Sequence, residues 1–156
     1  MIHAAFNDTG LNSIDKRTFS DKVPGAEKMN NFKAAFIGKK ILIVEDIPSN
    51  IQLLEAFLAP TGVSLIHEID GESAFKTFQE NADIDLILMD IRLPDISGLI
   101  VTKMIREVSP DVPIIAQTAY ALHTDRIQCL AAGCNDYIAK PIRRNDLLSI
   151  ISKYLF

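Results

Sequence analysis

Four apolar runs in this sequence are each followed by residue types that could carry out chemistry together. Glu45 and Asp46 follow ILIV, Asp90 follows LILM, Thr118 lies two residues after PIIA, and Lys140 follows YIA. Carboxylates can hold a hard divalent cation or attack phosphorus as nucleophiles. A lysine can balance the charge of a transferred group, and a threonine hydroxyl can donate a hydrogen bond to it. This combination of residue types indicates phosphoryl transfer.

Asp90 taken alone has an ordinary structural interpretation. An aspartate after a strand is commonly a turn former or a helix N-cap, and a nucleophile much less often. The presence of Asp46, Thr118 and Lys140 after the other runs favours the phosphoacceptor interpretation. Asp95 lies in the turn after Asp90, and we interpret it as the start of the next helix.

The elements that must position these residues follow from the pattern after Lys39. Short apolar runs, several rich in β-branched residues, alternate with amphipathic segments, as in parallel strands buried on both faces. Pro48 suits the first turn of one helix and Gly133 the C-terminal end of another. Five strands alternating with five helices predict an α/β fold with helices on both faces of the sheet. The predicted strands are 41–44, 63–66, 86–89, 113–116 and 137–139.

In such a sheet, ligands bind at the carboxyl ends of the strands. If the first and third strands are neighbours, Glu45, Asp46 and Asp90 converge on one small volume. Like charges so close together raise one another's pKa unless a cation lies between them. Mg²⁺ prefers oxygen ligands of this kind and keeps waters and phosphate oxygens in its shell. The sequence therefore predicts a magnesium site at this edge.

Residues 1–38 differ from the rest of the chain in composition. They mix Asn, Asp, Thr, Ser, Gly and Lys without strand-like runs. Within AEKMNNFKAAF, Met29, Phe32 and Phe36 share one helical face, which suggests a short helix docked on the domain. We interpret residues 1–38 as a linker or flexible N-terminal extension and residues 39–156 as the folded domain.

Charge and composition exclude several classes of function. The 156 residues carry a formal net charge of −4 at pH 7, whereas nucleic-acid-binding modules usually present a basic patch. No stretch approaches the roughly 18 to 20 apolar residues of a membrane helix. No signal peptide is evident, so a cytoplasmic location is expected. Cys129 and Cys134 have neither CxxC spacing nor a nearby histidine and are interpreted as free structural thiols.

Taken together, these motifs resemble the receiver domain of two-component response regulators over residues 39–156. The matching stretches are ILIVEDIPSN, LILMDIRLPDISG, IIAQTA and GCNDYIAKPI. Each stretch alone is weak, but all four in order, each at a predicted strand end, are specific. The resemblance implies a flavodoxin-like, doubly wound five-stranded parallel sheet with strand order 2-1-3-4-5 and five helices.

The resemblance also implies a role for each residue of the acidic site. Asp90 accepts a phosphoryl group from a phosphohistidine on a histidine kinase or a histidine phosphotransfer protein. Asp46 and Asp90 bind Mg²⁺ directly, together with the backbone carbonyl of Arg92, and Glu45 holds the metal through water. Glu45 stands where aspartate is commoner in this family, a frequent variant that leaves metal binding intact.

The remaining implied roles concern the phosphoryl group and the response to it. Lys140 contacts the phosphoryl group and precedes a cis peptide bond to Pro141. Thr118 and Tyr137 form the switch pair. A phosphorylation-dependent dimer is one assembly that the resemblance allows, and no enzymatic activity is implied beyond self-phosphorylation and self-dephosphorylation.

Several alternatives stay open from sequence alone. The chain could be a stand-alone regulator or the receiver of a hybrid sensor kinase, and GKKILIVEDIPSN slightly favours the hybrid or phosphorelay version. A haloacid-dehalogenase-like phosphatase also uses an aspartate at a strand end, but it needs a second aspartate where this chain has Arg92. A pseudo-receiver scaffold would keep the fold without accepting phosphate.

Overall fold

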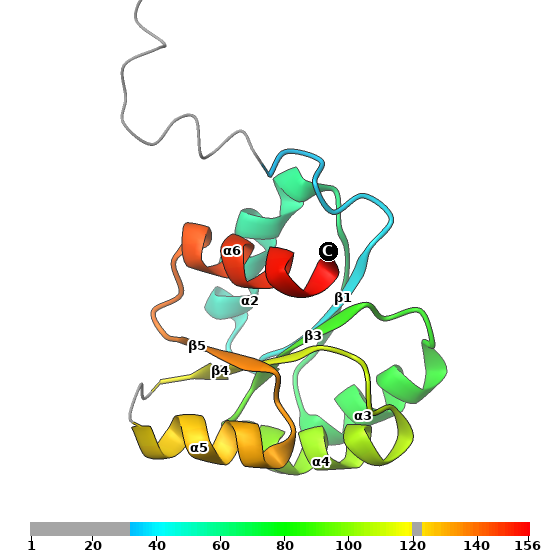
Figure 1. Cartoon of the computed structure of the whole chain (residues 1–156), viewed down its shortest axis with the longest axis vertical. Coiled ribbons are helices and arrows are strands. Elements are labelled where there is room, and N and C mark those ends of the chain that lie inside the picture. Colours follow the sequence, from blue (N-terminus) through cyan, green and yellow to red (C-terminus); the bar gives the residue numbers. More distant parts are fainter. Residues whose placement is uncertain (1–31, 120–122) are drawn as a thin grey trace, which may run out of the picture.

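The computed structural model describes residues 32–119 and 123–156, which form one parallel sheet covered by helices (Figure 1). The strand order is β2-β1-β3-β4-β5, so the predicted α/β fold and strand order are confirmed. In chain order the elements are β1 (Lys40–Val44), α2 (Pro48–Leu58), the short 3₁₀ helix η1 (Ala59–Thr61), β2 (Ser64–Glu68), α3 (Gly71–Glu80), β3 (Leu86–Asp90), α4 (Gly98–Val108), β4 (Ile114–Thr118), α5 (His123–Ala132), β5 (Asp136–Ala139) and α6 (Arg144–Leu155).

The strands lie within two residues of the predicted runs, and the differences have a physical cause. β4 begins after Pro113, which has no N–H group to donate to a neighbouring strand. It continues through Gln117 and Thr118, beyond the apolar run, and Gln117 lies opposite Asp90 of β3. The hydrogen-bond ladder sets the end of the strand, so polar residues at that end belong to it.

The two faces of the sheet have separate cores. Helices α2 and α6 cover one face, and α3, α4 and α5 cover the other (Figure 1). The first core includes Ile43, Leu88 and Ile115 from the strands, and the second includes Val44, Met89 and Ala116. This alternation is expected of strands buried on both faces. Within the described ranges, no helix is long and apolar enough to cross a membrane.

The helix ends agree with most of the sequence signals, but Asp95 does not. Pro48 opens α2, and Gly133 after α5 has a φ of 105°. The N-cap of α4 is Ser97, so the prediction that Asp95 starts this helix is wrong. The Asp95 carboxylate instead accepts hydrogen bonds from the backbone N–H groups of Gly71 and Glu72, at 2.8 and 2.9 Å, in the first turn of α3.

The segment just before β1 packs on the domain. Residues 32–38 form turns, so the suggested helix is not found in its described part, and Met29 lies outside the described residues. Phe36 is 0% exposed in the core beneath α2 and α6, and its ring lies 6.0 Å from that of Phe156. The Phe36 N–H donates to the carbonyl of Thr61 at 2.9 Å. The chain is therefore attached to the domain a few residues before β1 begins.

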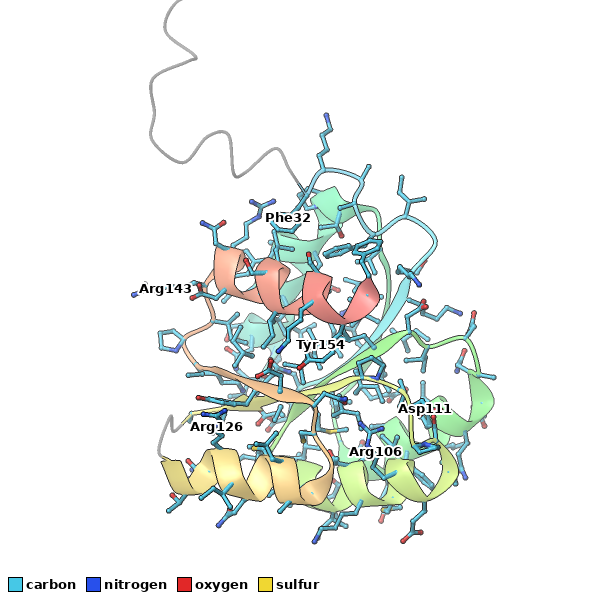
Figure 2. All side chains as sticks on the ribbon, in the orientation of Figure 1. Phe32, Arg106, Asp111, Arg126, Arg143 and Tyr154 are labelled. Carbon is cyan, nitrogen blue, oxygen red and sulfur yellow. The ribbon has the colours of Figure 1, made fainter. Side chains whose placement is uncertain are left out.

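Arg106 of α4 ties its helix to the turn that leads into β5 (Figure 2). Its guanidinium donates to the carbonyls of Ser109, Val112 and Gly133 and to the side-chain oxygen of Asn135, at 2.8 to 3.2 Å. The fixed fork of a guanidinium suits several acceptors at once. This contact helps to hold β5, which carries Tyr137 and leads into Lys140.

Candidate functional site

The functional candidates come together because all five strands run in the same direction. Glu45 follows β1, Asp90 ends β3, Thr118 ends β4 and Lys140 follows β5. β1 and β3 are paired neighbours, which is the arrangement that the predicted convergence of the carboxylates required. The carboxyl ends of these strands meet at one edge of the sheet.

Three carboxylates gather at this edge. One oxygen from each of Glu45, Asp46 and Asp90 lies within 4.8 Å of the others. Glu45 is 0% exposed and Asp90 is 5% exposed, whereas Asp46 is half-buried. Burying carboxylates close together is costly without a positive charge between them.

Lys140 supplies a positive charge to this cluster. Its ammonium donates to the carboxylates of Glu45 at 2.7 Å and Asp90 at 2.6 Å. Partial burial tends to lower the pKa of Lys140, but the hydrogen bonds to Asp90 and Glu45 outweigh this effect and raise it. Lys140 therefore carries its charge at neutral pH. The peptide bond to Pro141 is cis, as the resemblance implies.

The donor set of the cluster suits a hard divalent cation. All three groups are carboxylates, and the ammonium of Lys140 binds two of them, so one positive charge among three carboxylates leaves the site formally negative. Hard cations of this kind take oxygen ligands, whereas zinc sites favour cysteine and histidine. The residues that would hold the ion are Glu45, Asp46 and Asp90.

Asp90 is buried but borders open space. One carboxylate oxygen accepts a hydrogen bond from the backbone N–H of Arg92 at 2.8 Å, and the other is bound to Lys140. A cavity of about 360 Å³ adjoins it, lined by Thr118 and Lys140 among others. A small group that entered this cavity would meet Asp90, Thr118 and Lys140 at the same point.

The predicted switch residues lie on one face of adjacent strands. Tyr137 of β5 pairs with Ala116 of β4, two residues before Thr118. Tyr137 is half-buried against the core beneath α3, α4 and α5, and Thr118 is buried. Arg126 of α5 extends toward β5, with its guanidinium carbon 6.0 Å from the centroid of the Tyr137 ring (Figure 2). The Tyr137 ring is thus packed between the sheet and a helix.

Sequence reasoning missed one residue at this edge. Gln117 had no predicted role. In the structure Gln117 is 0% exposed, lines the cavity and lies opposite Asp90 in the sheet. A glutamine directly after an apolar run and before the predicted switch threonine was the available signal.

Comparison with known sequences gives a consistent result. A family model for the response regulator receiver domain matches residues 41–152. The transcription factor SKN7 of Saccharomyces cerevisiae is 40% identical over 126 residues, which cover 81% of this chain and 20% of SKN7. The polar-differentiation response regulator DivK of Brucella anthropi is 37% identical over 119 residues, which cover 75% of this chain and 96% of DivK. The chain thus spans nearly all of DivK but only a fifth of SKN7.

Solved structures with similar chains include two that bear on the site. The receiver domain of the sensor histidine kinase PA1611 from Pseudomonas aeruginosa PAO1, with a magnesium ion coordinated in its active-site cleft, is 43% identical with a TM-score of 0.70. The match covers 76% of this chain and 98% of that one. A co-crystal structure joins the Saccharomyces cerevisiae phosphotransfer protein Ypd1 to the receiver domain of its response regulator Ssk1. Its matching chain is 31% identical with a TM-score of 0.72, and the match covers 76% and 90% of the two chains.

Proposed function

Because this chain belongs to the response regulator receiver domain family of two-component signalling, we propose that Asp90 accepts a phosphoryl group from a phosphohistidine on a partner protein. The observation that carries the proposal is the ammonium of Lys140 bound to Glu45 and Asp90, beside a cavity that Asp90 lines. It places a buried carboxylate, a cation and space for the incoming group at one point. The partner is a histidine kinase or a histidine phosphotransfer protein.

The proposed transfer balances without an additional reactant. An Asp90 carboxylate oxygen attacks phosphorus as the bond from phosphorus to the partner's imidazole nitrogen breaks. The electron pair of that bond stays on the imidazole nitrogen. The imidazole leaves as a neutral ring because its other nitrogen carries a proton. The negative charge now lies on the phosphoryl oxygens. The ammonium of Lys140 contacts these oxygens, and the Thr118 hydroxyl donates a hydrogen bond to them.

The acidic cluster is proposed to hold Mg²⁺. Asp46, Asp90 and the backbone carbonyl of Arg92 would bind it directly, and Glu45 would hold it through water. When bound, Mg²⁺ offsets the negative charge on the reacting oxygens. Support comes from the convergent carboxylates of this chain and from the magnesium ion in the PA1611 receiver.

Two other functions fit the site less well. A haloacid-dehalogenase-like phosphatase would need a carboxylic acid where this chain has Arg92. A pseudo-receiver scaffold has no use for a lysine that bridges two buried carboxylates, an arrangement that is costly to bury. Neither is favoured over phosphoryl acceptance.

The wider setting of the chain is also a matter of proposal. A stand-alone regulator would resemble DivK in length, whereas a hybrid kinase or phosphorelay protein would contain this chain as one part. Within either, residues 39–156 act as the receiver and residues 1–38 as a linker or extension, with the segment from Phe32 packed on the domain. A cytoplasmic location, a phosphorylation-dependent dimer and activity limited to self-phosphorylation and self-dephosphorylation belong to the same proposal.

Acetyl phosphate with Mg²⁺ tests the acceptor. Wild-type protein should gain the mass of one phosphoryl group, and EDTA should prevent the gain. Asp90→Asn should abolish it, because an amide is not a nucleophile at phosphorus. Asp95→Asn is the matched control, since this carboxylate lies five residues away and only caps α3. A persistent one-to-one phosphoprotein in Asp90→Asn would show that Asp90 is not the acceptor.

A further inference from the structure

Gln117 is a buried polar residue whose hydrogen-bonding groups are not used. It is 0% exposed, and both its side-chain oxygen and its side-chain nitrogen have no hydrogen-bond partner among the described residues. A buried amide without a partner costs free energy, so its presence calls for an explanation. An explanation that fits its surroundings is a partner that arrives in another state of the site.

The position of Gln117 identifies that partner. Along β4, Ile115 belongs to the core beneath α2 and α6, so Gln117, two residues on, continues the same face. The same alternation places Glu45 after Ile43, Asp90 after Leu88 and Lys140 after Ile138. Four polar residues, each at or just after the end of one of four adjacent strands, therefore lie side by side on this face. Gln117 lies between Asp90, its partner in β3, and the strand that leads into Lys140.

Lys140 needs new acceptors whenever a cation takes its present ones. Its ammonium is bound to Glu45 and Asp90, and these are two of the three carboxylates that would hold a divalent ion. An ammonium has three donors and no acceptor, and 80% of this side chain's surface is covered, since only 20% is exposed. If the ammonium leaves these carboxylates but stays within the covered site, it needs another oxygen nearby as a hydrogen-bond acceptor. Gln117 and Lys140 line the same cavity.

We propose that Gln117 is a positioning residue for Lys140. When a divalent cation binds Glu45, Asp46 and Asp90, the carboxamide oxygen of Gln117 accepts a hydrogen bond from the ammonium of Lys140. The proposal rests on the function proposed above, because it requires a cation at the acidic cluster. Gln117 keeps the ammonium of Lys140 at the cavity, ready for the phosphoryl oxygens, and so favours cation binding. The unused amide of the metal-free state is the cost of that arrangement.

Titration of the full chain with Mg²⁺ by calorimetry tests the proposal. Gln117→Met replaces the amide with an apolar side chain of similar size. Mg²⁺ should bind this variant about tenfold more weakly, the value of one hydrogen bond to a charged group. The melting temperature of the metal-free variant should rise, because an unpaired buried amide is gone. Gln79→Met, at an exposed position of α3 that does not line the cavity, should leave both values unchanged.

A double-mutant cycle shows whether Gln117 acts through Lys140. In a Lys140→Met background, Gln117→Met should no longer change the affinity for Mg²⁺. A tenfold loss that persists without Lys140 would overturn the positioning role. A fall in the melting temperature of metal-free Gln117→Met would also overturn it, since the amide would then already be paired without the cation.

NMR of the wild-type protein provides a test that needs no variant. The side-chain amide resonances of Gln117 should shift with Mg²⁺ along the same curve as the Asp90 backbone amide. If Asp90 shifts and the Gln117 side chain does not, the inference fails while the proposed function stands. If Mg²⁺ shifts neither residue, the proposed magnesium site itself fails.

Discussion

At the scale of single residues, Lys140 stabilises the acidic cluster when no metal is bound. It is the counter-charge that binds two carboxylates that are almost wholly buried. Lys140→Met leaves them facing each other without a cation, which should lower the free energy of unfolding by about 3 kcal/mol. Urea unfolding in EDTA measures this loss. Mg²⁺ should recover most of it, because a divalent cation neutralises the same carboxylates.

The matched control for Lys140 is Lys153, which forms a comparable ion pair at the surface. Its ammonium lies 3.0 Å from Asp136, but its side chain is 64% exposed. Lys153→Met should therefore lower the free energy of unfolding far less than Lys140→Met does, with or without Mg²⁺. An equal loss in both lysine variants, unaffected by Mg²⁺, would contradict the role of Lys140 as the counter-charge of a buried cluster.

Asp95 acts at the scale of elements, because it joins the loop after β3 to the start of α3. Desolvation tends to raise the pKa of its carboxyl group, but hydrogen bonds from the backbone N–H groups of Gly71 and Glu72 outweigh this and lower the pKa to about 2. Asp95→Asn removes the charged acceptor from the helix N-terminus. It should lower the free energy of unfolding at pH 7 by about 0.5 to 1 kcal/mol, as expected of an exposed cap.

The pH dependence of this effect has a defined sign. The folded-state pKa of Asp95 lies below the ordinary value of 3.8 for this carboxyl group, so its contribution is present above about pH 4. It is lost as the pH falls from about 4 toward about 2. The gap between wild type and Asp95→Asn, measured by urea unfolding from pH 7 to pH 3, should therefore narrow below pH 4. A gap of the same size at pH 7 and at pH 3 would contradict this role of the Asp95 carboxylate.

The elements themselves were largely predictable from local patterns. Apolar runs of three or four residues located every strand, because a strand buried on both faces contains few polar residues that would interrupt such a run. The convergence of Glu45, Asp46 and Asp90 followed from parallel strand ends. The order of the strands came from the resemblance to receiver domains, since periodicity carries no information about which strands pair.

Other features escaped because they depend on contacts distant in the sequence. Asp95 caps a helix that begins 24 residues earlier in the chain, and nothing in the local turn indicates this. Phe36 fits an amphipathic helix by spacing, yet it is buried from a turn against α2 and α6. The unpaired amide of Gln117 becomes visible only when every neighbour on its face is known.

At the scale of the whole molecule, the acidic edge is connected to the surface formed by α5 and β5. Thr118 lies at the edge, and Tyr137 lies on the same face of the neighbouring strand. The ring of Tyr137 meets Arg126 of α5 at 6.0 Å, in the range of a cation–π contact. A change at Thr118 that moved this ring would alter both the sheet and the helix. We propose that the Tyr137 ring can adopt a second packing, rotated inward, and that phosphorylation biases the equilibrium between this packing and the present one.

Thr118→Ala tests this route from the site to the surface. Phosphorylation adds roughly 1.5 to 2 negative charges and three acceptor oxygens at the end of β3, which would draw the Thr118 hydroxyl toward them. Its movement would open space that Tyr137 can fill. In wild-type protein, beryllofluoride with Mg²⁺ as a phosphoryl mimic should shift NMR signals near Asp90 and also those of Tyr137, Arg126 and the rest of α5. Thr118→Ala should keep the shifts near Asp90, since Asp46 and Lys140 remain, and lose most of the distant ones. A full set of distant shifts in the variant would mean that the change leaves the site by another route, and Lys140 with the loop after β5 would be the next to examine.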